Sequence, residues 1–371
     1  MRILIINSFY YPLIANKGTG GSVRYCQSLH DVLRTNGHDV MHVTCKDSDI
    51  LYPGQQHVLA DRVDIMDESR KAKSDVTKKM ALEVLKVHND FKPDVIIDNS
   101  NKRILRTFGS KVNTPYIFMS HNITPIGSQD TSNIRDVLAD LKIFHVGVSK
   151  LQNENYSGIF DDIIKVHLAS MEFMVEEVQP AQNYAMHISR WDKYKAPWVV
   201  INKFLKYTKD IPVHFFTTFD GNDLEGTEKV LEKLRNNPRV IFHEDAPRTE
   251  MLDWISRAMV LLGNPIESAG ITALEANQNG VPYFVHVLND KTLAQSEYLC
   301  SEGMLKSHGD NYWRDFHEFV FNGQSLERRK KVAQWTRFVY GPLAFYQDHK
   351  RIIEKAIEMR ASLQSESLDL F

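Results

Sequence analysis

Cysteine is scarce in this sequence, and its scarcity narrows the class of protein. The 371 residues include three cysteines, Cys26, Cys45 and Cys300, and none stands at metal-ligand spacing from another. An odd number of scattered cysteines provides neither a disulfide framework nor a cysteine-based zinc site. We therefore expect reduced thiols in a cytoplasmic protein.

Long hydrophobic runs are missing as well. No apolar stretch approaches the roughly 18–20 residues that a membrane-spanning helix needs. The N-terminal run Ile3–Ile6 is far too short for a signal peptide, and it predicts a buried strand instead. The sequence therefore predicts no integral membrane span.

An excess of charge of one sign is the third absence. The chain has 45 Lys and Arg residues against 47 Asp and Glu residues, for a net charge of −2. This balance excludes a global electrostatic attraction to nucleic acid or to an anionic membrane. Hydrophobic residues make up 43% and charged residues 25%, as in soluble globular proteins. A chain of this length suits two domains rather than one.

Short β-branched runs alternate with helical patterns along the whole chain, which indicates a parallel α/β architecture. The predicted strands are Ile3–Asn7, Asp39–Val43, Asp94–Asp98, Tyr116–Met119, His145–Val148, Ala185–Ile188, Val213–Thr217, Val240–Phe242, Met259–Gly263 and Tyr283–Val287. Apolar residues at helical spacing fill the gaps, as in Val23–Thr35. The two halves are separated around Ala169–Asn183. We predict two Rossmann-like domains that face each other across a cleft.

Two glutamates eight residues apart form the most informative motif. Glu267 follows the apolar run Met259–Gly263, and Glu275 falls inside a helix that Gly270 is predicted to open. Parallel-sheet proteins bind ligands at the carboxyl ends of their strands, where a helix N-terminus offers free N–H groups to a phosphate. The two carboxylates could hold sugar hydroxyls on either side of a diphosphate.

This arrangement, with Gly280 and Pro282 trailing it, resembles the E-x7-E motif of retaining glycosyltransferases of the family-4 type. The resemblance implies the GT-B fold, in which a C-terminal helix crosses back to the N-terminal domain. It implies an N-terminal acceptor domain at residues 1–170, a nucleotide-sugar domain at 171–340 and the returning helix at 341–371. It also implies a UDP-sugar as co-substrate, with neither a cofactor nor a metal.

A pair of cations follows the first strand of the second half. Arg190 and Lys195 are similar to the cations of the family's G-R-x4-K-G pattern, although Ser189 and Ala196 replace its glycines. Because of these departures, Lys193 competes with Lys195 for the position. Two cations at a diphosphate would neutralise the charge that grows as the sugar–phosphate bond breaks.

The resemblance also assigns the remaining positions of the site. It implies a catalytic set of His121, Arg190, Lys195 and Glu267, with His121 beside the donor sugar. Donor contacts are predicted at Gly20, Gly21, Arg190, Lys195, Asp245, Ala246, Glu267, Ala269, Gly270, Ile271 and Glu275. Glu267 would hold sugar hydroxyls and Glu275 the ribose diol. The family commonly has E-G-F-G, and Ser268 and Ala269 in this chain imply a reshaped sugar pocket.

A basic segment suggests the acceptor. Between Arg70 and Lys111 the chain has eleven Lys and Arg residues and five Asp and Glu residues, a net charge of +6. Lys102, Arg103 and Arg106 follow a strand end and are the predicted acceptor-binding residues. Such a segment suits a polyanion, and the Arg190-Trp191 step resembles phage enzymes that glycosylate 5-hydroxymethylcytosine in DNA. That reading places the protein in the cytoplasm of a phage's host.

Two alternatives remain open. The first is a glycosyltransferase of surface polysaccharide or glycolipid synthesis, because basic patches also serve anionic membranes. The second belongs to another class, a sugar-nucleotide epimerase or an inactive sugar-nucleotide binder. An epimerase would convert its donor with no acceptor present. The sequence leaves the sugar, the nucleotide and the oligomeric state open.

Overall fold

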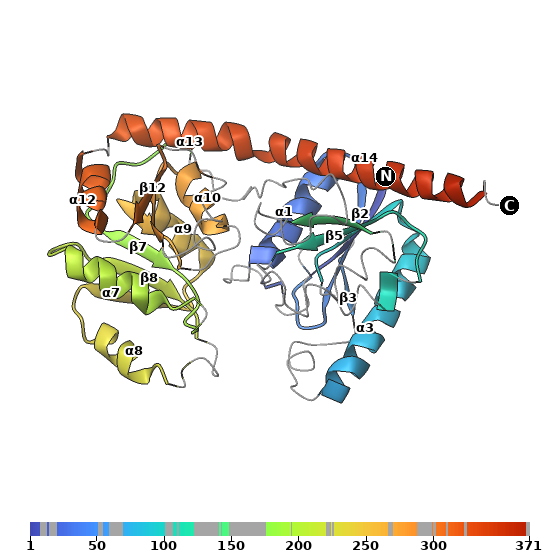
Figure 1. Ribbon diagram of the computed structural model, residues 1–371, viewed down its shortest axis with the longest axis horizontal. Helices are drawn as coiled ribbons and strands as arrows, with labels where there is room; N and C mark the ends of the chain where they lie inside the picture. The colour runs from blue at the N-terminus through green and yellow to red at the C-terminus, as the bar shows by residue number, and fades with distance from the viewer. Residues whose placement is uncertain are drawn as a thin grey trace. The chain divides into compact units, whose positions relative to one another are not determined.

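The computed structural model describes residues 1–7, 13–14, 21–50, 55–58, 70–100, 107–109, 111–121, 141, 143–147, 176–193, 195–219, 224, 226–265, 270–287, 299, 302–308, 311–322 and 325–368. They fall into two compact units. Unit 1 holds strands β1–β6 and, from the far end of the chain, helix α14, whereas unit 2 holds β7–β12 and the helices from α7 to α13. Figure 1 draws each unit with its own sheet and flanking helices.

The sheet of unit 1 is parallel, with strand order β3-β2-β1-β4-β5-β6. Its strands are β1 (Arg2–Ile6), β2 (Asp39–Cys45), β3 (Gln55–Val58), β4 (Val95–Asp98), β5 (Tyr116–Ser120) and β6 (Phe144–Gly147). In the central strand β1, Ile3 pairs with Val40 of β2 on one side and with Val95 of β4 on the other. Residues Ile3 to Ile6 are fully buried. Both faces of β1 are covered, which explains why its sequence is continuously hydrophobic.

Three long helices accompany this sheet: α1 (Gly21–Thr35), α3 (Arg70–Phe91) and α14 (Pro342–Leu368). Side chains of α14 hold it to the rest of unit 1. The Tyr25 hydroxyl in α1 lies 2.5 Å from Nε2 of His349 in α14. Further along, the Arg360 guanidinium donates to the backbone and side-chain oxygens of Asn113. The last helix of the chain is therefore an integral part of the first unit.

Unit 2 repeats the same topology. Its parallel sheet has the order β12-β11-β10-β7-β8-β9, with β7 (Ala185–Ile188), β8 (Val213–Thr217), β9 (Val240–Glu244), β10 (Val260–Leu262), β11 (Tyr283–Val287) and β12 (Met304–His308). The helices are α7 (Pro197–Tyr207), α8 (Glu228–Arg235), α9 (Arg248–Arg257), α10 (Ile271–Gln278), α12 (Tyr312–His317), the π-helical turn η4 (Glu318–Asn322) and α13 (Leu326–Tyr340). Counted within each unit, both sheets place strand one beside strand four, which is the doubly wound order of Rossmann folds.

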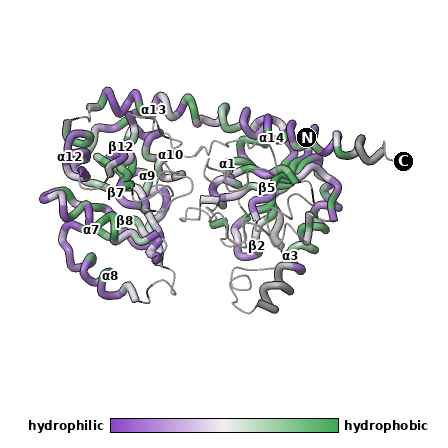
Figure 2. Tube along the Cα trace, viewed as in Figure 1, coloured by the Kyte–Doolittle hydropathy of each residue, from purple (hydrophilic) through white to green (hydrophobic). Residues whose placement is uncertain are grey.

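All ten predicted strands are present, with ends that shift by at most two residues. Two strands were missed, β3 and β12, and each lies at an edge of its sheet. Their sequences, Gln55–Val58 and Met304–His308, mix polar with apolar residues and lack the hydrophobic run of a strand covered on both faces. Figure 2 shows hydrophobic stretches in strands such as β5 and β7, and hydrophilic stretches along α8 and α13.

Candidate active site

The reversal of strand order in unit 2 defines where a ligand would bind. β7 and β10 are neighbours, with His187 paired to Leu262 near their carboxyl ends. Nδ1 of His187 donates to the Leu262 carbonyl over 2.9 Å and joins the two strands there. Burial lowers the pKa of His187 to about 4, with a smaller contribution from the charge of Lys195. The loops that follow β7 and β10 leave the same edge side by side, at the position where open α/β sheets bind their ligands.

The loop after β7 contains the predicted cation pair, and two buried side chains, Trp191 and Asp192, hold it in place. The Trp191 side chain is fully buried, and its indole Nε1 donates to the Thr227 hydroxyl over 2.9 Å. The buried carboxylate of Asp192 accepts from the Lys195 backbone N–H over 2.5 Å and pairs with the Arg190 guanidinium over 3.1 Å. The Arg190 side chain is 42% exposed, so its orientation is held while its head group stays accessible. The sequence motif did not single out Asp192.

The two candidate lysines of this loop point to different places. The Lys193 ammonium lies beside Gly226, 3.7 Å from the position a Cβ would take there. The charge of Lys195, in contrast, acts on His187 at the end of β7.

Ala196 stands where the G-R-x4-K-G pattern has a glycine, and its backbone conformation is one that favours glycine. Ala196 has a φ of +43° and a ψ of +54°, in the left-handed region, and it is the N-cap of α7. This conformation costs an alanine roughly 1–2 kcal/mol, whereas glycine adopts it freely. A glycine at this position would therefore be unstrained, whereas Ala196 adopts the left-handed conformation at a cost.

We expect Ala196→Gly to raise the free energy of unfolding by up to about 1 kcal/mol, because relief of the left-handed strain exceeds the entropy that glycine adds to the unfolded chain. Urea unfolding measures the change. Ala361→Gly, at an exposed helical position of α14, is the matched control and should cost about 0.5–1 kcal/mol. A loss of stability at both positions would contradict the strain argument.

The loop after β10 leads into the short helix α10, and Gly270 is its N-cap, as predicted. The backbone of Gly263, directly after β10, approaches the Tyr283 ring so closely that a Cβ would lie 2.9 Å from it. Glu267 and Ala269 lie outside the described residues. Ile271 opens α10, so its N–H is among the helix donors that have no partner within the helix.

Glu275, in the second turn of α10, is buried and ion-paired. Its Oε1 accepts from the guanidinium of Arg248, and the exposed fractions of the two side chains are 1% and 10%. Arg248 is the first residue of α9, 27 positions before its partner. No motif marked Arg248. The only available signal was that a buried carboxylate requires a cationic or hydrogen-bonding partner.

The predicted donor contacts Asp245 and Ala246 lie in a tight turn at the end of β9. Asp245 has a φ of +50°, and its N–H donates to the Thr217 carbonyl at the end of β8 over 3.0 Å. Ala246 follows, and Pro247 is the N-cap of α9.

In unit 1, His121 follows β5 directly. Its Nε2 lies 2.7 Å from Oδ1 of Asn99, the residue after β4. Its ring packs edge-on against the Tyr25 ring, with 5.0 Å between the ring centroids. An amide oxygen only accepts, so Nε2 carries the proton. Burial lowers the pKa of His121 to about 4, so the ring is neutral at physiological pH. Gly21 is the first residue of α1.

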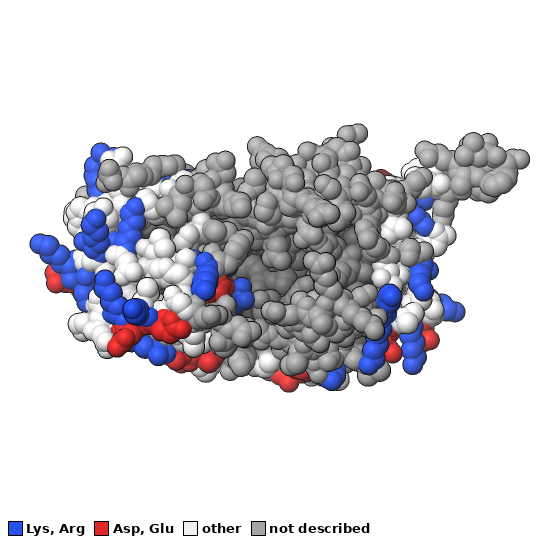
Figure 3. All heavy atoms as spheres, turned by 60° about the horizontal axis from the view of Figure 1, so that its bottom comes forward, with Lys and Arg blue, Asp and Glu red and all other residues white. Residues whose placement is uncertain are grey.

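Four predicted positions of unit 1 lie outside the described residues: Gly20, Lys102, Arg103 and Arg106. The described part of the basic segment includes exposed lysines on α3, among them Lys78, Lys79 and Lys86. On the face drawn in Figure 3, described Lys and Arg side chains lie among those of Asp and Glu.

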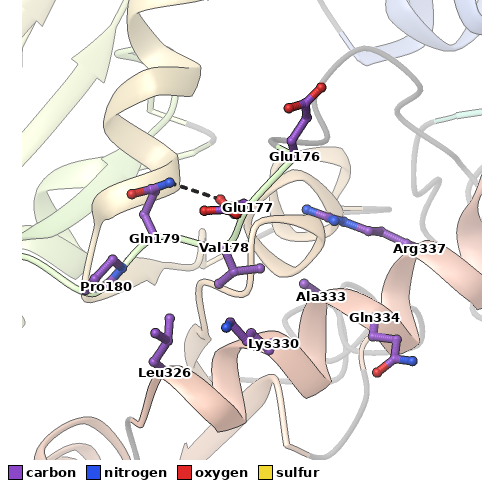
Figure 4. A pocket seen from close by; sticks show the side chains of 10 residues that line it. All are labelled: Glu176, Glu177, Val178, Gln179, Pro180, Leu326, Lys330, Ala333, Gln334 and Arg337. Atoms are coloured by element: carbon purple, nitrogen blue, oxygen red, sulfur yellow. Dashed lines mark hydrogen bonds between the residues drawn. The ribbon is translucent and has the colours of Figure 1, made fainter.

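A cavity of about 560 Å³ lies in unit 2, between the segment that leads into β7 and helix α13 (Figure 4). It is lined by Glu176, Glu177, Val178, Gln179, Pro180, Leu326, Lys330, Ala333, Gln334 and Arg337. Arg337 also donates to the Gln278 carbonyl at the end of α10 over 2.9 Å, and burial lowers its pKa. The cavity adjoins the amino end of β7, so it is distinct from the site at the carboxyl ends of β7 and β10.

Within the described part of the chain, no group of three or more His, Cys, Asp or Glu side chains is placed to hold a metal ion. None of the helices in the described ranges combines the length and the apolar character needed to cross a membrane.

Neither a protein-family model nor a curated protein matches this sequence. Solved structures, in contrast, match along nearly the whole chain. A glycosyltransferase of avilamycin A biosynthesis is 13% identical with a TM-score of 0.66, and the match covers 96% of this chain and 98% of that one. The Anabaena protein HepE in complex with UDP-glucose is 10% identical with a TM-score of 0.65, and the match covers 98% of this chain and 100% of that one. The lipopolysaccharide outer core galactosyltransferase WaaB is 12% identical with a TM-score of 0.62, and the match covers 96% of this chain and 99% of that one. The predicted GT-B fold of two Rossmann-like domains is confirmed.

Proposed function

We propose that this chain is a retaining glycosyltransferase that transfers a sugar from a UDP-sugar to a hydroxyl acceptor, and that the acceptor is 5-hydroxymethylcytosine in phage DNA. One observation supports the donor part of this proposal. Strands β7 and β10 are neighbours, and both of the loops that follow them start at the carboxyl edge of the sheet. The first loop contains Arg190 and Lys195, and the second leads to the N-terminus of α10. A structure of this fold in complex with UDP-glucose supports UDP as the nucleotide.

The proposed chemistry follows from these groups. The leaving diphosphate gains negative charge as the sugar–phosphate bond breaks. Arg190, Lys195 and the free N–H groups of α10 stabilise that charge, so they lower the barrier more than they tighten substrate binding. These cations do the work that a metal ion does in other transferases. The acceptor hydroxyl then attacks the face that the diphosphate leaves, and the anomeric configuration is retained without a carboxylate nucleophile.

The remaining residues hold the substrate. Glu267 binds sugar hydroxyls and Glu275 binds the ribose diol, in keeping with the E-x7-E resemblance. Backbone groups of Asp245 and Ala246 face the base. His121, neutral through burial, contacts the sugar from unit 1 as a hydrogen-bonding group without charge. Apart from His121, these donor contacts come from unit 2.

The basic segment of unit 1 supports a DNA acceptor. Helix α3 has exposed lysines at Lys78, Lys79 and Lys86. The segment from Arg70 to Lys111 has a net charge of +6, and its cations include Lys102, Arg103 and Arg106. Lys and Arg side chains that contact phosphates release condensed counterions, which favours binding at low salt. The target base would leave the duplex to reach the sugar, at a cost of a few kcal/mol.

A second candidate is a glycosyltransferase of cell-surface glycan or glycolipid synthesis. The observation that favours it is the match to a lipopolysaccharide outer core galactosyltransferase. An epimerase, the third reading, would change the donor sugar with no acceptor present. The three readings therefore differ in which acceptor, if any, receives the sugar.

The test is mass spectrometry of DNA containing 5-hydroxymethylcytosine after incubation with a panel of sugar nucleotides. We expect the modified base to gain the mass of one sugar, with UDP-sugars as donors, and unmodified DNA to stay unchanged. Neutralising Lys102, Arg103 and Arg106 together should weaken DNA binding and lower the slope of log K against log salt by roughly 0.9 per lost phosphate contact. Donor hydrolysis without acceptor should be unaffected.

Three results would redirect the proposal. Equal DNA affinity of the wild type and the triple variant at low and moderate salt would remove the nucleic-acid acceptor. Transfer to a glycan or glycolipid, with none to DNA, would establish the second candidate. A changed donor sugar with no acceptor in the reaction would establish the epimerase.

A further inference from the structure

The ion pair between Arg248 and Glu275 joins two parts of unit 2 that the proposed function uses separately. Arg248 begins α9 directly after the turn Asp245–Pro247, which is assigned to the base. Glu275 lies on α10 and is assigned to the ribose. The guanidinium Nη2 donates to the carboxylate Oε1, and both side chains are at least nine-tenths buried. The contact therefore links the two elements that would hold a nucleoside.

A buried carboxylate without a partner is costly, and it commonly takes up a proton instead. The Arg248 guanidinium is that partner for Glu275, and its contact with Oε1 holds the carboxylate in one orientation.

Another buried arginine of unit 2 shows what a purely structural role looks like. Arg329 in α13 donates to the backbone carbonyls of Ala258 over 2.7 Å and of Ser256 over 2.9 Å, at the end of α9. It ties α13 to α9 through main-chain groups. Arg248, at the other end of the same helix, contacts instead the one described carboxylate of the E-x7-E motif.

We propose that Arg248 is a positioning residue that holds the Glu275 carboxylate oriented toward the ribose diol, so that it sets the preference of the site for ribonucleotides over deoxyribonucleotides. The inference rests on the proposed function, because it presumes a nucleotide at this edge of unit 2. Arg248 acts through Glu275, and its loss removes the discrimination that the carboxylate provides rather than the diphosphate contacts.

The experiment compares the binding of UDP and of 2′-deoxy-UDP by calorimetry for the full-length wild type and its variants. The wild type is expected to bind UDP more tightly than 2′-deoxy-UDP by roughly 10-fold or more, the loss that follows removal of a charge-assisted hydrogen bond. Arg248→Ala should reduce this ratio to below about 3-fold, mainly by weakening UDP binding. Arg248→Lys, which keeps the charge but not the planar fork, should give an intermediate ratio.

Two controls isolate the role. Arg257→Ala removes an arginine from the same helix, one that pairs with Asp253 at the other end, and it should keep the wild-type ratio. Arg329→Ala is expected to lower the unfolding temperature and also keep the ratio. Should Arg248→Ala fail to fold, Arg248→Lys provides the same measurement.

The outcomes separate this inference from the function on which it rests. An Arg248→Ala variant that weakens both ligands equally, or neither, would show a structural pair only. A wild type that binds UDP with no preference for the ribose would overturn the inference and leave the diphosphate site intact. A wild type that binds no UDP at all would overturn the proposed donor and this inference with it.

Discussion

Arg190→Ala is expected to lower kcat roughly 100- to 1,000-fold, the loss typical of removing one preorganised donor to a developing oxyanion. The KM for the donor should rise much less, because the contact strengthens as charge develops on the diphosphate. The structure supports this split. Arg190 keeps 42% of its side chain exposed while Asp192 holds its guanidinium at 3.1 Å. The head group is thus oriented before substrate arrives.

Lys193→Ala is the matched control for this prediction. It removes a cation from the same loop, but one whose ammonium lies beside Gly226, and it should change kcat little. EDTA should leave wild-type activity intact, since cationic side chains neutralise the leaving group. Equal losses in the Arg190 and Lys193 variants, or a strict requirement for Mg²⁺, would contradict the assignment of Arg190 to the diphosphate.

Acidification from pH 7 to pH 5.5 is expected to cost this protein roughly 4 kcal/mol of folding free energy. Burial lowers the pKa of His42 and His145 to about 3 and that of His121 and His187 to about 4, below the ordinary 6.5. The unfolded chain therefore binds up to four more protons than the native state in this range, and stability falls as the pH falls. Asp98 acts in the opposite direction. Burial raises its pKa to about 6, so the native state gains a proton and recovers about 1 kcal/mol.

Urea unfolding at pH 7, 6 and 5.5 measures this dependence. His145→Gln removes one titrating group from unit 1 and should flatten the slope of unfolding free energy against pH by about one proton, or roughly 1.4 kcal/mol per pH unit. A wild-type stability that is constant from pH 7 to 5.5 would show that these rings are protonated in the native state.

The central strands and the helix behind Gly270 were predictable because their signals are local. β1 and β7 are short hydrophobic runs covered on both faces, and a glycine before α10 marks its start. Edge strands such as β3 carry no such run. The partner of Glu275 was not predictable, because the fold of unit 2, rather than spacing along the chain, brings Arg248 to it over 27 residues.

The choice between Lys193 and Lys195 shows the same limit at shorter range. Both lysines fit the family's spacing within two residues. The fold of the loop brings the Lys193 ammonium beside Gly226 and holds the Lys195 backbone N–H on the Asp192 carboxylate. Spacing along the chain alone does not predict these contacts.

The contact between Tyr25 and His349 spans 324 residues of sequence, and it bears on how the chain folds during synthesis. Helix α14 completes unit 1, yet the ribosome must make all of unit 2 before α14 emerges. At typical elongation rates of about 5–20 residues per second, the surface of α1 that α14 covers waits for tens of seconds. A nascent first half therefore exposes the Tyr25 region in the cell for that time, and chaperones that bind apolar surface have their longest opportunity there.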